Sequence, residues 1–299
     1  MKHHTRHGQN QAHGRLLAVV IWVAFAATAA ANTVELRTDA ASCRVDLDGA
    51  RIVSFAVGGR EVLWNDDPPQ TRAADWAHGG IPLCWPWFGV DTNGVIHGTA
   101  WRSGFDVIRR RDRNGRSEVD LLLTNATARL VYRIVLTDAL ELGLETRNTG
   151  TSDINLPTGF HPYFRVAERD RAFVTGVDGL RYEDDPSCPV PASGTWSGVL
   201  PMTNAIDRIF NLGGRARSVM RLVDPACSRV VVVESAGASD VNVWNPGAAK
   251  LCPGIVPGDE WRRFVFVEPI RVGTGGAPLA IAPGGRVFLK MTVRLVTGK

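Results

Sequence analysis

The chain has 299 residues, of which 44% are hydrophobic and 21% charged, with a formal net charge of +4. This length and apolar content suffice for one large domain or two small ones with a buried core, and they exclude a disordered chain. Lys2, Arg6 and Arg15 lie within residues 1–31, which hold no acidic residue, so the remaining chain carries a net charge of +1. This balance predicts no nucleic-acid partner and no membrane-surface partner.

The N-terminus has the pattern of an export signal. Residues 1–15 are basic and polar, residues 16–30 carry no charge, and small residues follow in "TAAAN". The apolar stretch is shorter than the ~20 residues that a membrane span needs. We expect residues 1–31 to be a cleavable signal peptide, with a periplasmic or extracellular protein and no stable membrane insertion after cleavage. An uncleaved membrane anchor and a wrongly assigned start are the alternatives.

The rest of the chain is typical of strands. Residues 140–148 and 289–296 alternate apolar and polar side chains with a period of two, the pattern of a half-buried strand. Further strand-like runs, separated by Gly, Pro, Asn and Asp clusters, occupy residues 51–57, 119–124, 130–137, 229–235 and 262–269. No amphipathic helix exceeds two turns. The sequence predicts an all-β sandwich or barrel, with residues 32–299 as a single domain.

The stretch "HGGIPLCWPWFG" at residues 78–89 is aromatic, rigid and almost uncharged. Its prolines fix the backbone and its glycines allow close approach. One interpretation is the wall of a carbohydrate pocket, in which Trp85 packs against a sugar and His78 binds it. The alternative is an aromatic core segment with tight turns.

Only His78, His97 and His161 remain beyond the leader. His161 precedes a proline and is flanked by aromatic residues, so its imidazole is a candidate general acid near neutral pH. A buried structural histidine is the alternative at each position.

Glu268 is the matching candidate base. It falls on the same strand face as Phe264 and Phe266, and partial desolvation there raises the pKa of a carboxyl group. A glutamate that reaches water at a strand end is the alternative. A raised Glu268 and a His161 in one pocket would form an acid–base pair.

Five cysteines are present, at positions 43, 84, 188, 227 and 252. No C-x-x-C pair occurs, so we expect no zinc or other metal site. We interpret Cys84 as a packing residue, and the pairing of the other four stays open.

Several blocks, in order, resemble the aldose 1-epimerase (mutarotase) superfamily, and more narrowly its glucose-6-phosphate 1-epimerase-like branch. The similar segments are "LDGARIVSF", "GGIPLCWPWFG", "HGTAW", "GFHPYFRV", "IDRIF", "VWNPG" and "GDEWRRFVFVEP". The resemblance implies a large antiparallel β-sandwich of the galactose mutarotase type. It also implies interconversion of α and β anomers of a hexose, free or 6-phosphorylated, without a cofactor or metal, and we expect a monomer.

Roles carried over by position follow from the same resemblance. It implies that Glu268 takes the proton of the anomeric hydroxyl and that His161 protonates the ring oxygen. It also implies that His97 and Asp207 bind and orient sugar hydroxyls.

Two positions depart from the pattern of this branch. His78 and Trp101 stand where the branch usually has arginines that hold the sugar phosphate, a role that suits guanidinium groups. We therefore expect phosphate recognition to be lost or rebuilt, with Arg72 or Arg102 as possible replacements. A non-catalytic carbohydrate-binding protein of the cell envelope is the alternative function, and an intracellular sugar-phosphate epimerase with a misread leader is a third.

Overall fold

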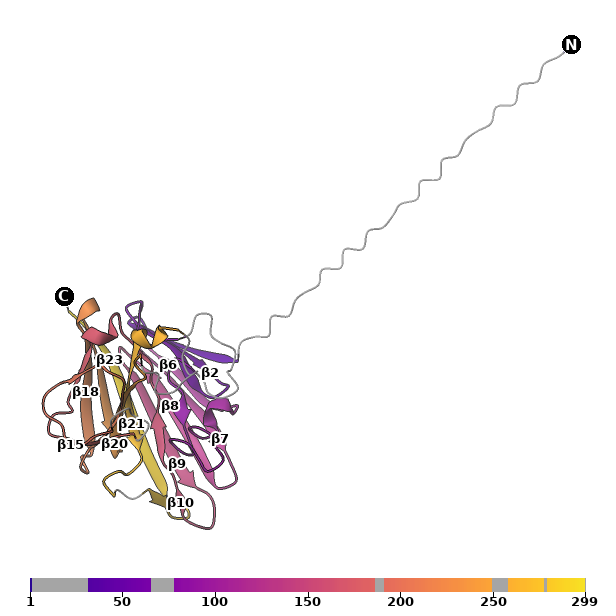
Figure 1. The fold of residues 1–299 in the computed structure, drawn as a ribbon. Coiled ribbons are helices and arrows are strands. Elements are labelled where there is room, and N and C mark those ends of the chain that lie inside the picture. Colours follow the sequence, from indigo (N-terminus) through magenta and orange to yellow (C-terminus); the bar gives the residue numbers. More distant parts are fainter. Residues whose placement is uncertain (2–31, 66–77, 186–190, 249–257, 277–278, 299) are drawn as a thin grey trace. The chain divides into compact units, whose positions relative to one another are not determined.

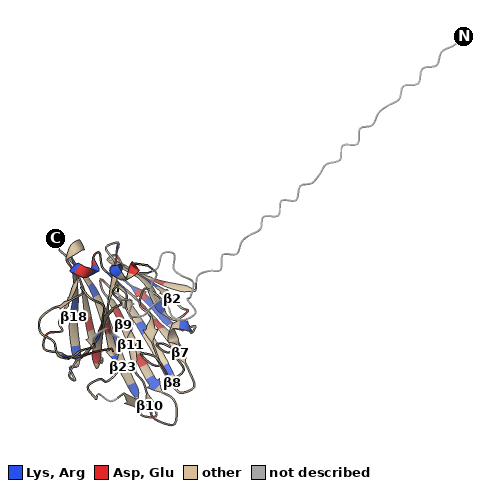
Figure 2. Ribbon diagram, viewed as in Figure 1, with Lys and Arg blue, Asp and Glu red and all other residues tan. Residues whose placement is uncertain are grey.

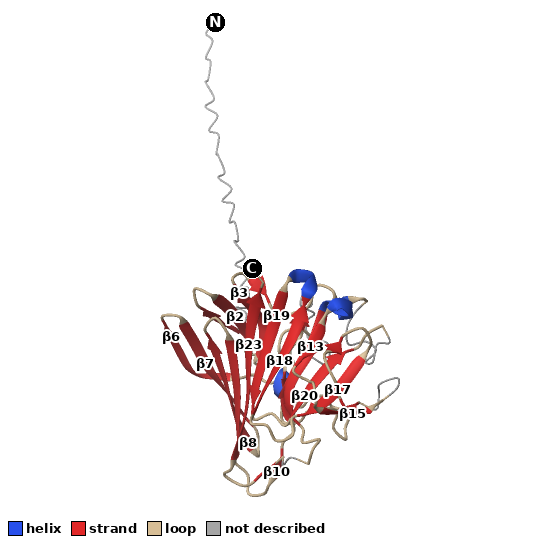
Figure 3. Cartoon of the chain, turned by 90° about the vertical axis from the view of Figure 1, so that its left-hand side faces the viewer, coloured by secondary structure: helices blue, strands red, loops and turns tan. Residues whose placement is uncertain are grey.

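Strands make up most of the chain, with only short helical turns between them (Figure 3). The computed structural model describes Met1 and residues 32–65, 78–185, 191–248, 258–276 and 279–298. Residues 2–31 of the expected signal peptide, together with Arg72, Cys188 and Cys252, lie outside the described residues. Residues 32–299 form one compact unit.

The larger sheet has nine strands. From edge to edge they are β16 (Leu200–Pro201), β13 (Phe173–Thr175), β18 (Arg217–Asp224), β19 (Arg229–Ala236), β23 (Arg286–Thr297), β9 (Leu140–Asn148), β8 (Ala128–Leu136), β7 (Arg116–Thr124) and β6 (Asp106–Arg113). The alternation predicted for residues 140–148 is present, since Leu140, Leu142 and Leu144 are buried while Glu141 is exposed.

The second large sheet has eight strands. In order they are β15 (Ser193–Thr195), β14 (Arg181–Asp184), β17 (Ile206–Asn211), β20 (Asp240–Asn245), β21 (Phe264–Arg271), β11 (Thr158–Phe160) and β5 (Leu83–Cys84), with β12 (Phe164–Arg165) paired to β21. Strands from residues 83 to 271 thus meet in one sheet, and this sheet carries the candidate site.

Two small sheets and four short turns complete the described structure. The small sheets contain β1 (Thr33–Arg37), β2 (Ala41–Asp46), β3 (Arg51–Val57) and β4 (Arg60–Glu61), and β10 (Ile154–Asn155) with β22 (Ala280–Ile281). The 3₁₀ turns are η1 (Ala100–Arg102), η2 (Arg169–Arg171), η3 (Pro225–Cys227) and η4 (Glu260–Arg263).

The core lies between the two large sheets, which overlap in the view of Figure 1, and one cluster of buried residues includes strands of both sheets. Tyr132 of β8 and Phe160 of β11 meet there with ring centroids 6.2 Å apart. The ladders between the named strands are antiparallel, as between β8 and β9 and between β20 and β21. This confirms the predicted all-β, antiparallel sandwich.

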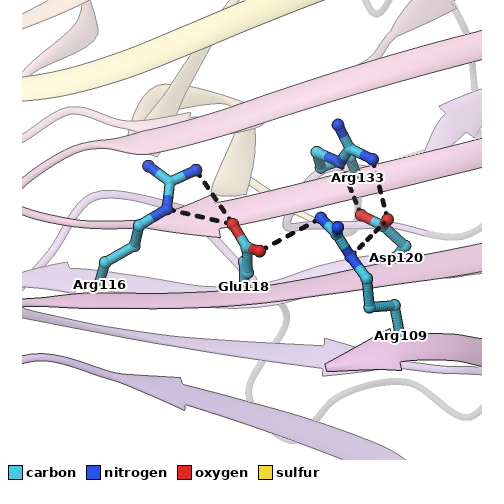
Figure 4. Close-up of polar contacts among 5 residues, drawn as sticks. All are labelled: Arg109, Arg116, Glu118, Asp120 and Arg133. Carbon is cyan, nitrogen blue, oxygen red and sulfur yellow. Dashed lines mark hydrogen bonds and ion pairs between the residues drawn. The ribbon is translucent and has the colours of Figure 1, made fainter. Parts of the chain in front are cut away.

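Charges of both signs are interspersed along the strands rather than gathered by sign (Figure 2). On β6, β7 and β8 they form a ladder in which Glu118 contacts Arg116 and Arg109, and Asp120 contacts Arg109 and Arg133, at 2.8–3.2 Å (Figure 4). The three arginines are about a third to a half exposed, so each pair contributes little to stability. Within the described residues, no helix is both long enough and apolar enough to cross a membrane.

Candidate active site

The site lies on the face of the eight-stranded sheet that points away from the core. β20 and β21 are buried on both faces. Val243 and Val267 pair with each other and belong to the core, so the neighbouring pair, Asn242 and Glu268, points to the opposite face.

His161 reaches this face from the turn that follows β11. Its backbone N–H donates to the carbonyl of Pro82 at 3.1 Å, which holds the turn against the 78–89 stretch. Its Nδ1 then lies 3.3 Å from Oε1 of Glu268, with side chains 10% and 1% exposed, respectively. Residues more than a hundred positions apart are therefore in contact, as an acid–base pair requires.

Asn242 joins two carboxyl groups. Its Nδ2 donates to Oε2 of Glu268 and to Oδ1 of Asp207, both at 3.1 Å. Its own Oδ1 is buried and has no hydrogen-bond partner among the described residues. Sequence reasoning did not single out Asn242, although an asparagine in the otherwise apolar run "DVNVW" was a usable signal.

His97 is held in an unusual backbone conformation beside the pair. It has φ +54°, in the left-handed region, and its N–H donates to the Gly89 carbonyl at 2.7 Å. The N–H of Gly89 in turn donates to Nδ1 of His97 at 3.0 Å. Because Nδ1 accepts, the neutral ring carries its proton on Nε2. The ring centroid lies 4.9 Å from that of His161.

Burial shifts the pKa values of the carboxyl and imidazole groups of the site in opposite directions. It raises the pKa of Glu268 well above its ordinary value, and the charge of Asp207 raises it further. It lowers the pKa of His161 well below its ordinary value, and His97 and His78 add to that effect. Burial also raises the pKa of Asp207 to about 7 and lowers that of His97 to about 3. Burial therefore favours the neutral forms of Glu268, His161 and His97.

Aromatic side chains form a floor beside the pair. Phe266 stacks on Trp244 at 4.6 Å and meets the ring of His161 edge-on at 4.6 Å. We call the whole cluster the aromatic floor; it consists of Trp64, Tyr163, Trp244, Trp261, Phe264 and Phe266. It excludes water from one side of the acid–base pair.

The sequence pattern of the family described as aldose 1-epimerase matches residues 32–294. The chain belongs to the aldose 1-epimerase family. A relative from Salmonella typhimurium, named "Putative glucose-6-phosphate 1-epimerase", is 28% identical over 242 residues, covering 75% of this chain and 78% of its own. A relative of the same name from Escherichia coli is 26% identical, covering 74% and 77%.

Solved structures share the fold. A structure titled as a putative mutarotase from Salmonella typhimurium superposes with a TM-score of 0.75 at 23% identity, covering 89% of this chain and 90% of its own. The galactose 1-epimerase of Lactobacillus acidophilus superposes with a TM-score of 0.70 at 14% identity, covering 89% and 95%. These likenesses confirm the mutarotase-type sandwich.

The position of Trp85 in this aldose 1-epimerase family member corrects the expectation that its ring forms the wall of a carbohydrate pocket. It is fully buried in the core between the sheets, where its Nε1 donates to Oγ1 of Thr146 on β9 at 3.1 Å. The backbone of the 78–89 stretch turns this indole inward, so its ring does not face the outer surface of the sheet. Trp87 and Phe88 of the same stretch are partly exposed, and Phe88 contacts His97 with ring centroids 5.0 Å apart.

Trp101 and Arg102 lie at the next turn. Trp101 is 7% exposed, packs with Cys84 and Phe88, and donates from Nε1 to the Gly98 carbonyl at 3.1 Å. Arg102 is exposed, with its guanidinium carbon 5.6 Å from the Trp101 ring centroid. Trp101 therefore supports the segment that carries His97.

His78 is half-buried and close enough to affect the pKa of His161. Burial, with the nearby charge of Arg51, lowers the pKa of His78, which therefore favours its neutral form. Cys84 is fully buried and unpaired, and burial raises the pKa of its thiol well above the ordinary value. The structure thus places His78, His97 and His161 around one site. Among the described residues, no group of three or more His, Cys, Asp or Glu side chains is arranged to hold a metal ion.

A separate hollow of about 770 Å³ opens at the start of β21 and is lined by charged residues, including Arg165, Arg169 and Arg229. Two of its arginines are held by backbone carbonyls. Arg169 donates to the carbonyl of Met202 and Arg229 to that of Arg165. His161 and Glu268 do not line this hollow, so we assign the active site from their contact rather than from the size of a cavity.

Proposed function

We propose that this protein is a hexose 1-epimerase that interconverts α and β anomers by acid/base ring opening. The observation that carries the proposal is the buried contact between His161 and Glu268 at 3.3 Å. Membership in the aldose 1-epimerase family supports the reaction class.

In the proposed mechanism the pair shares one proton. Glu268, as a carboxylate, takes the proton of the anomeric hydroxyl while His161, as an imidazolium, gives one to the ring oxygen. The C1–O5 bond breaks and leaves an open-chain aldehyde. After C1 rotates, the O5 hydroxyl adds to the aldehyde carbon, its proton returns to His161, and Glu268 protonates the new anomeric oxygen. The number of protons on the pair is the same before and after each step.

His97 and Asp207 suit the orientation of sugar hydroxyls. The Nε2–H of His97 is a fixed neutral donor because its Nδ1 is already used by Gly89. Asp207 is linked to Glu268 by the amide group of Asn242, which donates to both, and Asp207 supplies a hydrogen-bond acceptor. Donor and acceptor on the two sides of the pair match the hydroxyls of a pyranose.

We further propose that the hexose carries no phosphate. The two sequence relatives named above are named for glucose 6-phosphate. A phosphate group is best held by a permanent cation, whereas His78 favours its neutral form and Trp101 has no charge.

Saturation-transfer NMR of α/β exchange tests the function with glucose, galactose and glucose 6-phosphate. We expect faster exchange of a free hexose, and a loss of about 100-fold or more in Glu268→Gln, because the variant keeps the shape of the side chain but cannot act as a base. Glu234→Gln, on the opposite sheet, is the matched control.

Exchange that survives in Glu268→Gln would contradict the role of the pair. No acceleration with any of the three sugars would favour the alternative, a carbohydrate-binding protein on the same fold. Turnover of glucose 6-phosphate alone would contradict the loss of phosphate recognition.

A further inference from the structure

Arg208 follows Asp207 in the segment "IDRIF" and points to the opposite face of β17. In the sheet register it pairs on one side with Val243, which belongs to the core, and on the other side with Asp184. Directly paired residues of antiparallel strands point to the same face. Arg208 and Asp184 therefore lie behind the candidate active site, while Asp207 lies on the face that carries it.

The side chain of Arg208 is held by a carboxylate and by two aromatic rings. Its Nε and Nη2 donate to the two carboxylate oxygens of Asp184 at 2.5 and 2.8 Å, and the two side chains are 13% and 6% exposed, respectively. Its guanidinium carbon lies 4.1 Å from the ring centroid of Tyr182 and 4.7 Å from that of Trp196. Only a planar guanidinium can pair with a carboxylate through two nitrogens and also lie against aromatic rings. We call these four residues the arginine clamp.

Core packing alone fixes β17 only in part. Its neighbour β20 and the next strand, β21, are buried on both faces, whereas four of the six residues of β17 are half-buried. On the other side of β17 only the short strands β14 and β15 continue the sheet. The arginine clamp joins β17 to β14 at the position of Asp207.

Asp207 connects the arginine clamp to the acid–base pair. Its carbonyl accepts a hydrogen bond at 2.8 Å from the N–H of Asp185, the residue that follows Asp184 of the clamp. Its carboxylate accepts from Asn242 at 3.1 Å, and Asn242 also donates to Glu268 at 3.1 Å. A shift of β17 against β14 would therefore move the Asp207 carboxylate within the site.

The charge of Arg208 also supports the ionised form of Asp207. Burial raises the pKa of Asp207 to about 7, and the charges of Asp185 and Asp184 add to this effect. The guanidinium of Arg208 offsets the charge of Asp184 at contact distance. It thus favours the carboxylate form of Asp207, which is the form that accepts hydrogen bonds from hydroxyls.

We propose that Arg208 is a positioning residue that sets Asp207, from behind the sheet, to accept a hydroxyl of the hexose. The inference rests on the proposed function, and it adds a residue that does not touch the sugar. A hydroxyl contact is made in the ground state as well as in the transition state, so its loss weakens substrate binding more than it slows ring opening. His161 and Glu268 keep their own contact at 3.3 Å.

The first test measures kcat and KM of anomeric exchange with the free hexose that the wild type turns over best. In Arg208→Lys we expect KM to rise about 10-fold and kcat to change less than about 2-fold, because lysine keeps the charge but loses the planar fork. Arg133→Lys is the matched control, since Arg133 donates from the same two nitrogens to Asp120 at 2.8 and 2.9 Å on the nine-stranded sheet (Figure 4). Equal changes in the two variants, or a fall in kcat with an unchanged KM, would overturn the proposal.

A double-mutant cycle separates positioning from a general loss of stability. If Arg208 acts through Asp207, Arg208→Lys adds nothing to the KM of Asp207→Ala, whereas independent effects multiply and would overturn the proposal. Trp196→Leu serves the same cycle if Arg208→Lys does not fold. It removes one ring from the clamp and leaves the contact with Asp184, so we expect KM to rise about 3-fold, again only when Asp207 is present.

If the wild type turns over no sugar, the proposed function fails, and NMR of the protein itself decides the positioning role. The side-chain amide signal of Asn242, identified by its loss in Asn242→Leu, reports the hydrogen bond to Asp207. A signal that moves in Arg208→Lys but not in Arg133→Lys supports the positioning role. A signal that stays in place, or that moves equally in both variants, overturns it.

Discussion

At the scale of single residues, burial acts in opposite directions on the proposed acid–base pair. Desolvation penalises a charged carboxylate and a charged imidazolium alike, so it raises the pKa of Glu268 and lowers that of His161. A pair that shares one proton has no net charge wherever the proton sits, which is the arrangement that a buried site tolerates best. Moving the shared proton from Glu268 to His161 gives the carboxylate and imidazolium that the proposed ring opening uses, without changing the net charge of the pair.

Asn242 is the residue through which this balance can be tested. Its N–H donation stabilises the carboxylates of Glu268 and Asp207 and lowers the pKa of each. In Asn242→Leu the pKa of Glu268, which also faces His161, rises further, so the pair holds its proton on Glu268 more often and loses it only at higher pH. We expect the alkaline limb of the kcat/KM profile to move up by about one pH unit and the plateau to fall about 10-fold.

The measurement is the pH–rate profile of anomeric exchange. Asn148→Leu is the control, because Asn148 is also buried and makes two hydrogen bonds through its amide nitrogen, on β9 and away from the site. A lower melting temperature in Asn242→Leu with an unmoved alkaline limb would mean that Asn242 has only a structural role.

At the scale of elements, the segment from residue 78 to residue 101 depends on backbone conformations that only certain residues adopt. Gly98 has φ +78°, and a Cβ there would lie 2.1 Å from the carbonyl oxygen of Trp85. Gly98 therefore packs directly against Trp85, which lies in the core, while the preceding residue, His97, lies at the site. The glycines of "HGGIPLCWPWFG" and "HGTAW" therefore serve chain packing as well as the site.

Substitution of Gly98 by alanine is expected to disrupt the packing of this segment against the backbone of Trp85. The added Cβ collides with backbone, which cannot rotate away, so we expect a loss of more than ~2 kcal/mol of unfolding free energy and a large loss of exchange activity. Gly94→Ala is a close control, since Gly94 has φ +79° with nothing within 4 Å of a Cβ. Its cost is the left-handed conformation alone, about 1–2 kcal/mol. Urea unfolding compares the two, and equal losses would contradict the steric argument.

At the scale of the whole molecule, the faces of the two large sheets have different roles. The inner faces pack into one core, the outer face of the eight-stranded sheet carries the candidate site, and the nine-stranded sheet carries the ion-pair ladder of Figure 4. Because the aromatic floor fills part of the outer face, the central strands are buried on both sides, which is unusual for an antiparallel sheet.

We also propose that the protein acts outside the cytoplasm, because residues 1–31 have the composition of an export signal. Intact mass measurement of the protein from a membrane-free periplasmic or extracellular fraction is expected to give an N-terminus near Asn32. An intact Met1 in a cytoplasmic fraction would contradict export, and an intact Met1 in the membrane fraction would indicate an uncleaved anchor.

The sequence by itself determined the strand content, the sandwich class and the shared face of Phe264, Phe266 and Glu268, because alternation with a period of two is a local property of the chain. Its ordered blocks also marked His161 and Glu268 before their contact at 3.3 Å was known. The tertiary structure alone decided that Trp85 turns into the core and that Asn242 joins Asp207 to Glu268. The physical reason is that these outcomes depend on strand order and register between segments far apart in the chain, which local side-chain patterns do not encode.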